Sequence, residues 1–440
     1  MSNAPQVHVV QRRPKPVSAL VAVVVGLALL VGACSSTSTE GSTSAGSATT
    51  GTSAPAAPVD YSGLGPYPVG TLEVDLGDRK AVVYYPADRA ATAGAEVFNS
   101  YSTGIAFSES LRAALPAAFV QQVQLGTDTY RGVRANPQGP FPVVLHSHGF
   151  SGFYLFESRY MVHLASWGFV VAAPDHKERS LQGQLDPANA SRAPGQDVTD
   201  LKNTLAKLKD ANVAADGPLK GAMNLDQIAA TGHSAGGSAA GRLILQSPEV
   251  KTFIGKAPGA PIDTANIPRD LPADQRAVAV QQALATTTPP DKPSMLITGE
   301  TDGVIPLATV KVEYDWLRAP KKLAVIKNAG HNAFTDLCPP IREQGGLLQY
   351  ASQLPEAFVG VLRLGEDGCT PASLDPQKGY AYIDHLTVAQ LRWVFGLDTS
   401  EVSLAPGFLQ ATFPDAFGPY FTDPTLTGLY GRDTGREHRP

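Results

Sequence analysis

A Gly-His-Ser-Ala-Gly pentapeptide at residues 232–236 places the strongest constraint on what this chain can fold into. It follows the short apolar run 228–230 and precedes 239–245, a stretch that favours a helix. A strand that turns directly into a helix leaves almost no room for side chains beside the turn, which explains the glycine at each end of the motif. Such a turn holds Ser234 in a strained conformation with its hydroxyl exposed, as a nucleophilic serine requires. The same five residues could also be a glycine-rich loop that opens a helix, so the rest of the chain decides between the two.

Apolar runs that alternate with helix-like stretches indicate an α/β fold with a mostly parallel sheet. Buried strands are expected at 141–146, 168–175, 225–230, 293–299 and 322–326, and an early edge strand closed by proline at 81–86. Helical patterns cover 155–167, 198–208, 239–245 and 383–395, and 108–123 could form a further helix. Because ligands bind at the carboxyl ends of the strands in such sheets, the residues that follow each strand are the candidate site residues.

Two residues that follow late strands complete a candidate catalytic set with Ser234. Asp302 lies in the loop after the strand at 293–299, where a carboxylate can hold a histidine ring in one tautomer. His331 follows the strand at 322–326, and its imidazole can take the serine proton and return it because it titrates near neutral pH. Serine, aspartate and histidine occur here in an order that differs from those of chymotrypsin and subtilisin.

Other residues remain candidates for the acid and the base. Glu300 in the same loop, or Asp263 in the segment before it, could serve as the acid, and Asp302 could instead be a capping carboxylate. Two further histidines follow Asp302 in the chain. His385 lies in a helix-like run with apolar neighbours, which favours a packed role, and His438 lies among charges in the last three residues. Neither position suits a catalytic base.

The segment His-Ser-His-Gly-Phe at 146–150 follows the third strand and is typical of a loop whose N–H groups face the substrate. We expect the backbone N–H groups of Phe150 and Ala235 to bind the oxyanion. The ring of Phe150 is expected to form a wall of the acyl pocket, and His233 to contact the substrate. For the two histidines of the segment the pattern favours a structural role, in which they pack and hydrogen-bond the loop.

The N-terminus has the features of an export signal with a lipid anchor. Three cations at 12–15 precede an apolar stretch at 17–31 that is short for a membrane span, and Val-Gly-Ala leads directly into Cys34. We therefore predict a lipoprotein signal peptide at 1–33 and lipidation of Cys34 on the outer face of a bacterial cell membrane. An ordinary signal peptide or an uncleaved anchor are the alternatives. The Ser/Thr/Gly-rich segment 34–59 reads as a disordered tether that spans about 25–30 Å.

The remainder, 60–440, is interpreted as one catalytic domain, because no linker interrupts it. It carries an insertion at 335–382 beside the candidate site and a C-terminal extension at 400–440, whose aromatic residues indicate that it packs on the body. In an exported chain Cys338 and Cys369 most simply form a disulfide. Closing their 31-residue separation would stabilise the fold by about 3–4 kcal/mol. Two free buried thiols are the alternative.

Composition excludes some partners. The formal net charge is −5 even though the N-terminal segment is cationic, which argues against nucleic acid. Neither late cysteine has metal-ligand spacing to a histidine, so neither a metal site nor a cofactor is expected. Nothing in the sequence indicates an oligomeric state.

Five parts of the chain together resemble the α/β-hydrolases: His148-Gly149-Phe150, residues 168–176, residues 232–237, the Asp302 loop and the His331 loop. More narrowly they resemble the branch that holds platelet-activating-factor acetylhydrolase-like and cutinase-like polyester hydrolases and relatives of dienelactone hydrolases. The similarity spans about residues 70–335 and the terminal helix near 395. It implies a metal-free serine esterase that acts through an acyl-enzyme. True dienelactone hydrolases use a cysteine nucleophile, where this chain has Ser234.

The expected function is therefore a cell-envelope serine esterase whose substrate is a small-molecule, lipid or polymer ester. An amidase or peptidase on the same fold is the nearest enzymatic alternative, because the catalytic residues alone do not separate esters from amides. A surface lipoprotein that keeps the fold without catalysis is the alternative from another class.

Overall fold

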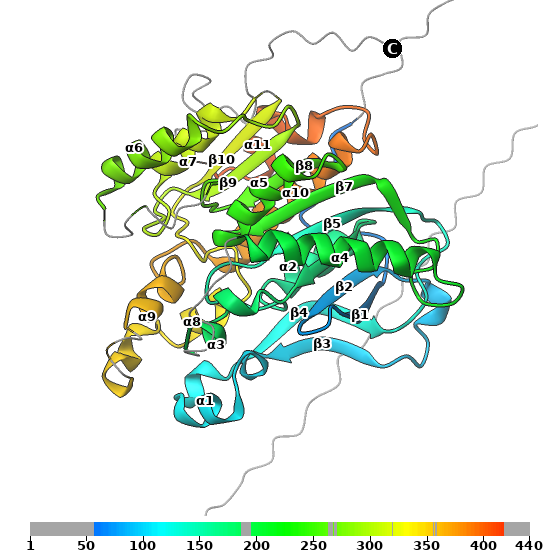
Figure 1. Cartoon of the computed structure of the whole chain (residues 1–440), viewed down its shortest axis with the longest axis horizontal. Coiled ribbons are helices and arrows are strands. Elements are labelled where there is room, and N and C mark those ends of the chain that lie inside the picture. The colour runs from blue at the N-terminus through cyan, green and yellow to red at the C-terminus, as the bar shows by residue number, and fades with distance from the viewer. Residues whose placement is uncertain are drawn as a thin grey trace, which may run out of the picture. The chain divides into compact units, whose positions relative to one another are not determined.

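The computed structural model describes residues 57–185, 195–262, 267, 271–318, 320–354, 356 and 359–417 (Figure 1). The chain divides into the units Met1–Ala54 and Pro55–Pro440, and the whole fold described below belongs to the second. The expected signal peptide, Cys34, Asp263 and His438 lie outside the described residues. Among the helices that are described, none is long and apolar enough to cross a membrane.

A ten-stranded sheet forms the centre of the second unit, in the order β10-β9-β8-β7-β5-β6-β2-β1-β4-β3. The strands from β6 through β5 to β10 pair in parallel, whereas β2 pairs antiparallel with both β6 and β1. The strands are β1 Val69–Asp75, β2 Lys80–Pro86, β3 Val97–Ser102, β4 Gln122–Arg131, β5 Phe141–Ser147, β6 Val170–Pro174, β7 Met223–His233, β8 Val250–Lys256, β9 Ser294–Gly299 and β10 Lys321–Ile326.

Helices cover both faces of the sheet (Figure 1). The α-helices are α1 Glu109–Ala114, α2 Ser158–Ser166, α3 Leu181–Leu185, α4 Gln196–Val213, α5 Ala235–Gln246, α6 Ala273–Leu284, α7 Leu307–Trp316, α8 Cys338–Glu343, α9 Val359–Glu366, α10 Pro376–Val394 and α11 Pro406–Thr412. Short 3-10 helices are η1 Arg89–Ala91, η2 Thr103–Ala106, η3 Ala117–Phe119, η4 Lys177–Arg179, η6 Leu348–Gln353 and η8 Val402–Leu404.

The two faces of the sheet carry separate apolar cores because successive strand residues point to opposite sides. In β5, Val144 belongs to the core that contains α2 and α10, whereas Val143 and Leu145 belong to the core that contains α4, α5 and α7. Helix α4 presents one apolar face to this second core at spacings of three and four residues, formed by Val198, Leu201, Leu205 and Leu208. The layers therefore follow from the periodicity of the sequence.

The buried strands expected from apolar runs are present as β5, β6, β7, β9 and β10. The interpretation of 81–86 as an edge strand is wrong, because β2 lies inside the sheet between β1 and β6. Segment 95–138 explains the difference: it supplies β3 and β4, which together with β1 extend the sheet beyond β2. These strands have alternating burial, and their short polar-rich runs gave no readable period.

Two of the expected helices differ most from their expected bounds. The helix suggested at 108–123 is limited to α1 and η3, and β4 begins at Gln122. The closing helix begins at Pro376, because the carboxylate of Asp375 accepts a hydrogen bond from the N–H of Gln377 and caps its first turn. Part of the expected insertion is therefore the first turns of α10.

The disulfide between Cys338 and Cys369 is present, with 4.8 Å between the two Cα atoms. Both cysteines are buried in a small apolar cluster with Ile341, Leu347 and Leu362. The described part of the C-terminal extension packs on the body, as its aromatic composition indicated. Its buried members in the first core are Leu404, Leu409, Phe413, Ala416 and Phe417.

A fully buried ion pair connects the sheet to α2. The ammonium of Lys256, the last residue of β8, donates to Glu157, which precedes α2, and both side chains are 0% exposed. The second carboxylate oxygen of Glu157 lies 2.9 Å from Nε2 of His146. Burial alone would raise the pKa of Glu157, but the charge of Lys256 and the hydrogen bond with His146 hold that pKa well below its usual range. Glu157 is therefore an anion with fixed partners.

Replacing Lys256 by methionine (Lys256→Met) leaves the Glu157 carboxylate buried without its counter-charge. We expect urea unfolding to show a loss of about 3–5 kcal/mol in the free energy of unfolding. The double variant Lys256→Met/Glu157→Gln removes both charges but retains an amide beside His146, so it should regain a large part of that loss. A double variant that is no more stable than Lys256→Met would contradict this account.

Candidate active site

The Gly-His-Ser-Ala-Gly motif forms the sharp turn between β7 and α5. Ser234 lies at the junction with φ 55° and ψ −120°, a conformation that non-glycine residues rarely adopt. A Cβ atom at Gly232 would lie 2.2 Å from the carbonyl oxygen of Gly236, and one at Gly236 would lie 1.8 Å from that of Ser147. Both positions therefore require glycine, and the backbone strain at Ser234 is maintained by the packing of the two elements.

His331 lies between Ser234 and Asp302. The three residues follow three different strands, β7, β9 and β10. The Nε2 of His331 is 2.8 Å from the Oγ of Ser234, and its Nδ1 is 2.9 Å from Oδ2 of Asp302. The other oxygen of Asp302 accepts hydrogen bonds from the N–H groups of Val304 and Ile305, at 2.9 and 2.7 Å. The carboxylate is thus fixed in orientation, and the structure brings all three predicted residues into one hydrogen-bonded chain.

Among the other candidates that the structure describes, none contacts this chain of hydrogen bonds through its side chain. Glu300 accepts a hydrogen bond from the N–H of Asn328 instead. His385 is fully buried in α10, where its Nδ1 accepts from the N–H of Tyr61 and its Nε2 donates to the carbonyl of Ser403. The packed role expected for His385 is confirmed.

The loop after β5 lies against the nucleophile turn. A Cβ atom at Gly149 would lie 3.3 Å from the Cβ of Ser234, so the chain before Phe150 passes directly beside the serine. Ala235 is the first residue of α5, where backbone N–H groups have no partner within the helix. This placement suits the oxyanion donors expected at Phe150 and Ala235.

Arg179, which lies in η4 after β6 and was not among the predicted site residues, connects the loop after β5 to the first turn of α5. Its buried guanidinium donates to the hydroxyl of Ser147 at 2.6 Å, to the carbonyl of His148 at 2.5 Å and to that of Ala235 at 3.4 Å. Asp197 at the start of α4 balances the charge at 2.7 Å. Arg179 thereby fixes the distance between the loop after β5 and the first turn of α5.

His233 has surroundings that differ from the expected contact with substrate. Its side chain is buried, and its Nε2 lies 2.9 Å from the carbonyl oxygen of His331. Burial and the neighbouring His331 lower the pKa of His233 to about 4, so its ring is neutral near pH 7 and can donate to that carbonyl. A role in positioning the His331 loop fits this geometry better than substrate binding.

The histidines of segment 146–150 have the structural contacts expected from the sequence. His146 lies between Glu157 and Thr231, and His148 donates from Nδ1 to the carbonyl of Gly149 while its Nε2 accepts from the N–H of His176. Burial lowers the pKa of His148 well below its ordinary value. These neutral rings hold the loop rather than take part in proton transfer with Ser234.

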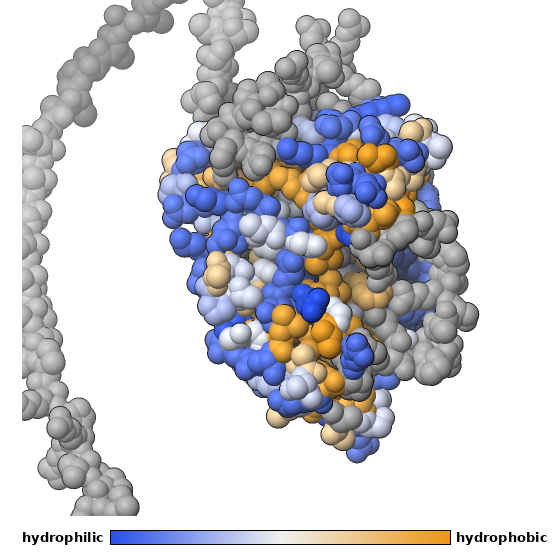
Figure 2. All heavy atoms as spheres, turned by 90° about the vertical axis from the view of Figure 1, so that its left-hand side faces the viewer, coloured by the Kyte–Doolittle hydropathy of each residue, from blue (hydrophilic) through white to orange (hydrophobic). Residues whose placement is uncertain are grey.

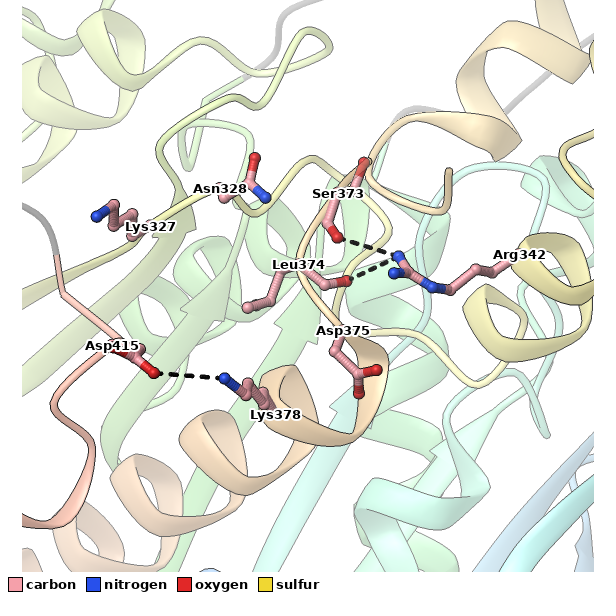
Figure 3. A pocket seen from close by; sticks show the side chains of 8 residues that line it. All are labelled: Lys327, Asn328, Arg342, Ser373, Leu374, Asp375, Lys378 and Asp415. Atoms are coloured by element: carbon pink, nitrogen blue, oxygen red, sulfur yellow. Dashed lines mark hydrogen bonds and ion pairs between the residues drawn. The ribbon is translucent and has the colours of Figure 1, made fainter. Parts of the chain in front are cut away.

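The carboxyl ends of the strands open onto the side of the molecule that carries α3, α8 and α9, on the left in Figure 1. Figure 2 looks onto this side, where apolar side chains gather in a strip beside a hydrophilic area. A pocket of about 420 Å³ is lined by Lys327, Asn328, Arg342, Ser373, Leu374, Asp375, Lys378 and Asp415 (Figure 3). Its lining includes none of Ser234, Asp302 and His331. In the described part of the chain, no cluster of histidine, cysteine or acidic side chains could hold a metal ion.

Strand order, the serine turn at the end of β7 and the placement of the acid and the base after β9 and β10 decide the fold. The chain has the α/β-hydrolase fold. Residues 61–195 match the family model of platelet-activating factor acetylhydrolase, isoform II. This match to the α/β-hydrolases supports a carboxylic ester hydrolase. It includes the loop before Phe150 and ends before Ser234.

A ferulic acid esterase from Streptomyces cinnamoneus is among the solved structures similar to this chain, with 21% sequence identity and a TM-score of 0.48. The similarity covers 77% of this chain and 91% of that chain. No curated protein sequence matches the chain.

Exchanging Asp302 for asparagine tests its place beside His331. The asparagine oxygen can still accept from the N–H groups of Val304 and Ile305, which directs its NH₂ group at Nδ1 of His331. The ring must then carry its proton on Nε2 and cannot accept from Ser234. We expect kcat on an activated ester to fall about 10,000-fold while the melting temperature changes little.

Glu300→Gln is the matched control, because Glu300 lies in the same loop and its carboxylate accepts a hydrogen bond from the N–H of Asn328. Its kcat should stay within twofold of wild type. Equal losses in the two variants would show that the loop, and not the carboxylate of Asp302, matters.

Proposed function

We propose that this chain cleaves carboxylic esters through an acyl-enzyme formed on Ser234, with His331 as general base and acid and Asp302 as the residue that orients it. The observation that carries the proposal is the unbroken chain of hydrogen bonds from the Oγ of Ser234 through the ring of His331 to Asp302, at 2.8 and 2.9 Å. Serine at a strained turn beside such a base has the geometry of an activated nucleophile.

Acylation begins when the Ser234 oxygen attacks the ester carbonyl and its proton moves to Nε2 of His331. Asp302 accepts the Nδ1–H of the resulting imidazolium and stabilises its charge. The N–H groups of Phe150 and Ala235 bind the oxyanion of the tetrahedral intermediate, and such a donor contributes about 3–4 kcal/mol to transition-state stabilisation. Collapse of the intermediate releases the alcohol, which takes the proton from His331. Water then attacks the acyl-serine by the same route and releases the acid.

Esters are favoured over amides by the family match on residues 61–195, whose description names an acetylhydrolase. The apolar strip on the side of the strand ends suits an ester with an apolar acyl or alcohol part (Figure 2). A non-catalytic role is less compatible with a serine held at φ 55°, because strain of this kind is retained where it serves a mechanism.

The serine esterase is tested with p-nitrophenyl esters from acetyl to palmitoyl, for wild type and Ser234→Ala in parallel. We expect hydrolysis by wild type and background rates in the variant, and the preferred chain length reports the size of the acyl pocket. A fluorophosphonate probe should label wild type and not Ser234→Ala. Labelling without hydrolysis of any ester would favour amides, and a folded protein that shows neither would favour the non-catalytic role.

We further propose that the enzyme works at the outer face of a bacterial cell membrane, attached through a lipid on Cys34. The support is the sequence pattern at the N-terminus, with a cationic start, a short apolar stretch and small residues before the cysteine. The tether of residues 34–59 would let the catalytic domain stand clear of the membrane surface.

Cys34→Ser tests the anchor in a bacterial host that processes lipoproteins. We expect wild type in the membrane fraction, with a mass at its mature N-terminus that includes the lipid. The variant should carry no lipid, so none of its esterase activity should belong to a lipid-modified protein. Equal, unlipidated N-termini in both proteins would contradict the proposal.

A further inference from the structure

One carboxylate besides that of Asp302 contacts both the loop of Asp302 and the loop of His331. Asp367 follows α9, and its Oδ1 accepts a hydrogen bond from the backbone N–H of His331 at 2.6 Å. Its Oδ2 accepts from the N–H of Gly303, the residue directly after Asp302, at 3.1 Å. The two oxygens of a single side chain therefore connect the loop of the acid to the loop of the base.

Both loops have glycine where this carboxylate approaches them. A Cβ atom at Gly303 would lie 2.6 Å from Oδ2 of Asp367, and one at Gly330 would lie 2.4 Å from Oδ1. At Gly330 the same atom would also lie 2.5 Å from the backbone nitrogen of Gly368. A side chain at either loop position would displace Asp367, so the two loops are shaped to admit it.

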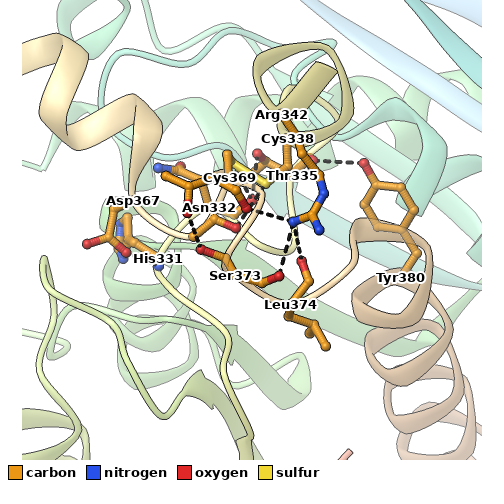
Figure 4. The surroundings of a disulfide bond; sticks show 12 residues. His331, Asn332, Thr335, Cys338, Arg342, Asp367, Cys369, Ser373, Leu374 and Tyr380 are labelled. Atoms are coloured by element: carbon orange, nitrogen blue, oxygen red, sulfur yellow. Dashed lines mark hydrogen bonds between the residues drawn. A yellow bond between two sulfur atoms is a disulfide. The ribbon is translucent and has the colours of Figure 1, made fainter. Parts of the chain in front are cut away.

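The backbone around Asp367 is held from two directions (Figure 4). Its carbonyl oxygen accepts a hydrogen bond from the N–H of Asn332 at 2.8 Å, so the residue after the base is bound as well. Two residues further along the chain, Cys369 forms the disulfide with Cys338, whose sulfur also contacts the carbonyl of Gly368 at 3.3 Å. The carboxylate is thus presented from a cross-linked and hydrogen-bonded segment rather than from a free loop.

We propose that Asp367 is a positioning residue for the reaction, which holds the loops of Asp302 and His331 at the separation that their hydrogen bond requires. The inference rests on the proposed function, because it concerns the same base. Asp367 does not reach the ring of His331 or the hydroxyl of Ser234 through any of its hydrogen bonds. It acts through the backbone, and its loss should leave the binding of substrate intact while it lowers the rate of the chemical steps.

Asp367→Asn keeps the size of the side chain but removes its negative charge and one of its two acceptor oxygens. Asparagine has one side-chain oxygen, so its NH₂ group must face one of the two N–H donors, at His331 or Gly303. The two loops can then no longer be joined by one side chain. We expect kcat on p-nitrophenyl acetate to fall about 10- to 100-fold with KM nearly unchanged, because small displacements of catalytic groups have effects of this size. The downfield proton signal of the Nδ1–H of His331 in one-dimensional NMR should broaden or disappear.

Glu366→Gln is the matched control. Glu366 precedes Asp367 and accepts from the N–H groups of Leu347 and Leu348, inside the same segment and away from the catalytic loops. This variant should keep kcat and the NMR signal even where it lowers the melting temperature. If Glu366→Gln and Asp367→Asn lose kcat equally, or if Asp367→Asn stays within twofold of wild type, the positioning role is overturned.

Two further measurements separate this result from loss of fold and from failure of the esterase proposal. Titration of active sites with a fluorophosphonate, at a temperature where circular dichroism shows Asp367→Asn to be folded, gives kcat per competent site. If wild type hydrolyses no ester, the proposed function fails, yet the rate of fluorophosphonate labelling of Ser234 still reports on Asp367. A labelling rate equal to that of wild type would then overturn the positioning role by itself.

Discussion

The nucleophile depends on a backbone contact that only glycine permits. The first turn of α5 lies so close to the end of β5 that a single Cβ atom at Gly236 would overlap the carbonyl oxygen of Ser147. This contact sets the distance between the serine and the loop that leads to Phe150, and Arg179 then holds the same two segments by hydrogen bonds to His148 and Ala235. The proposed nucleophile and the proposed oxyanion donors are therefore positioned by one rigid junction between two neighbouring strands.

Buried charged side chains lie beside this junction and hold the elements around it in place. Lys256 is the clearest case, because its side chain pairs with Glu157 while its carbonyl oxygen accepts the N–H of Ser234 at 2.9 Å. The desolvation of two ions is costly, so an ion pair at 0% exposure adds little stability compared with apolar packing. Its effect is geometric: it fixes α2 and β8 around the strained serine, and neutral His146 extends the same hydrogen bonds to β5.

In a parallel sheet the residues that follow the strands meet at one edge, which explains why the candidate serine, acid and base could be predicted together. Ser234, Asp302 and His331 each follow a strongly apolar parallel strand, and such strands direct the residues that follow them to one edge of the sheet. Asp367 follows a helix, α9, and Arg179 lies five residues after β6, in a segment without a readable period. Their contacts arise from how segments without a readable period fold over the edge, which local pattern does not encode. For Asp367 one signal existed: it lies two residues before Cys369, and a disulfide in the segment after the base places that residue near His331.

The position of the disulfide also has a consequence for when the protein becomes a competent catalyst. Serine, acid and base are all synthesised before Cys369, so the segment that braces the base is the last contributor to the site to emerge. Its covalent link forms only where thiols are oxidised, which excludes the cytosol of most bacteria. If the chain is exported as we propose, it carries its serine during export but a base whose loop lacks the cross-linked support. Under the proposed location, maturation of the esterase would coincide with its arrival outside the cell, and the esters of the cytoplasm would be spared.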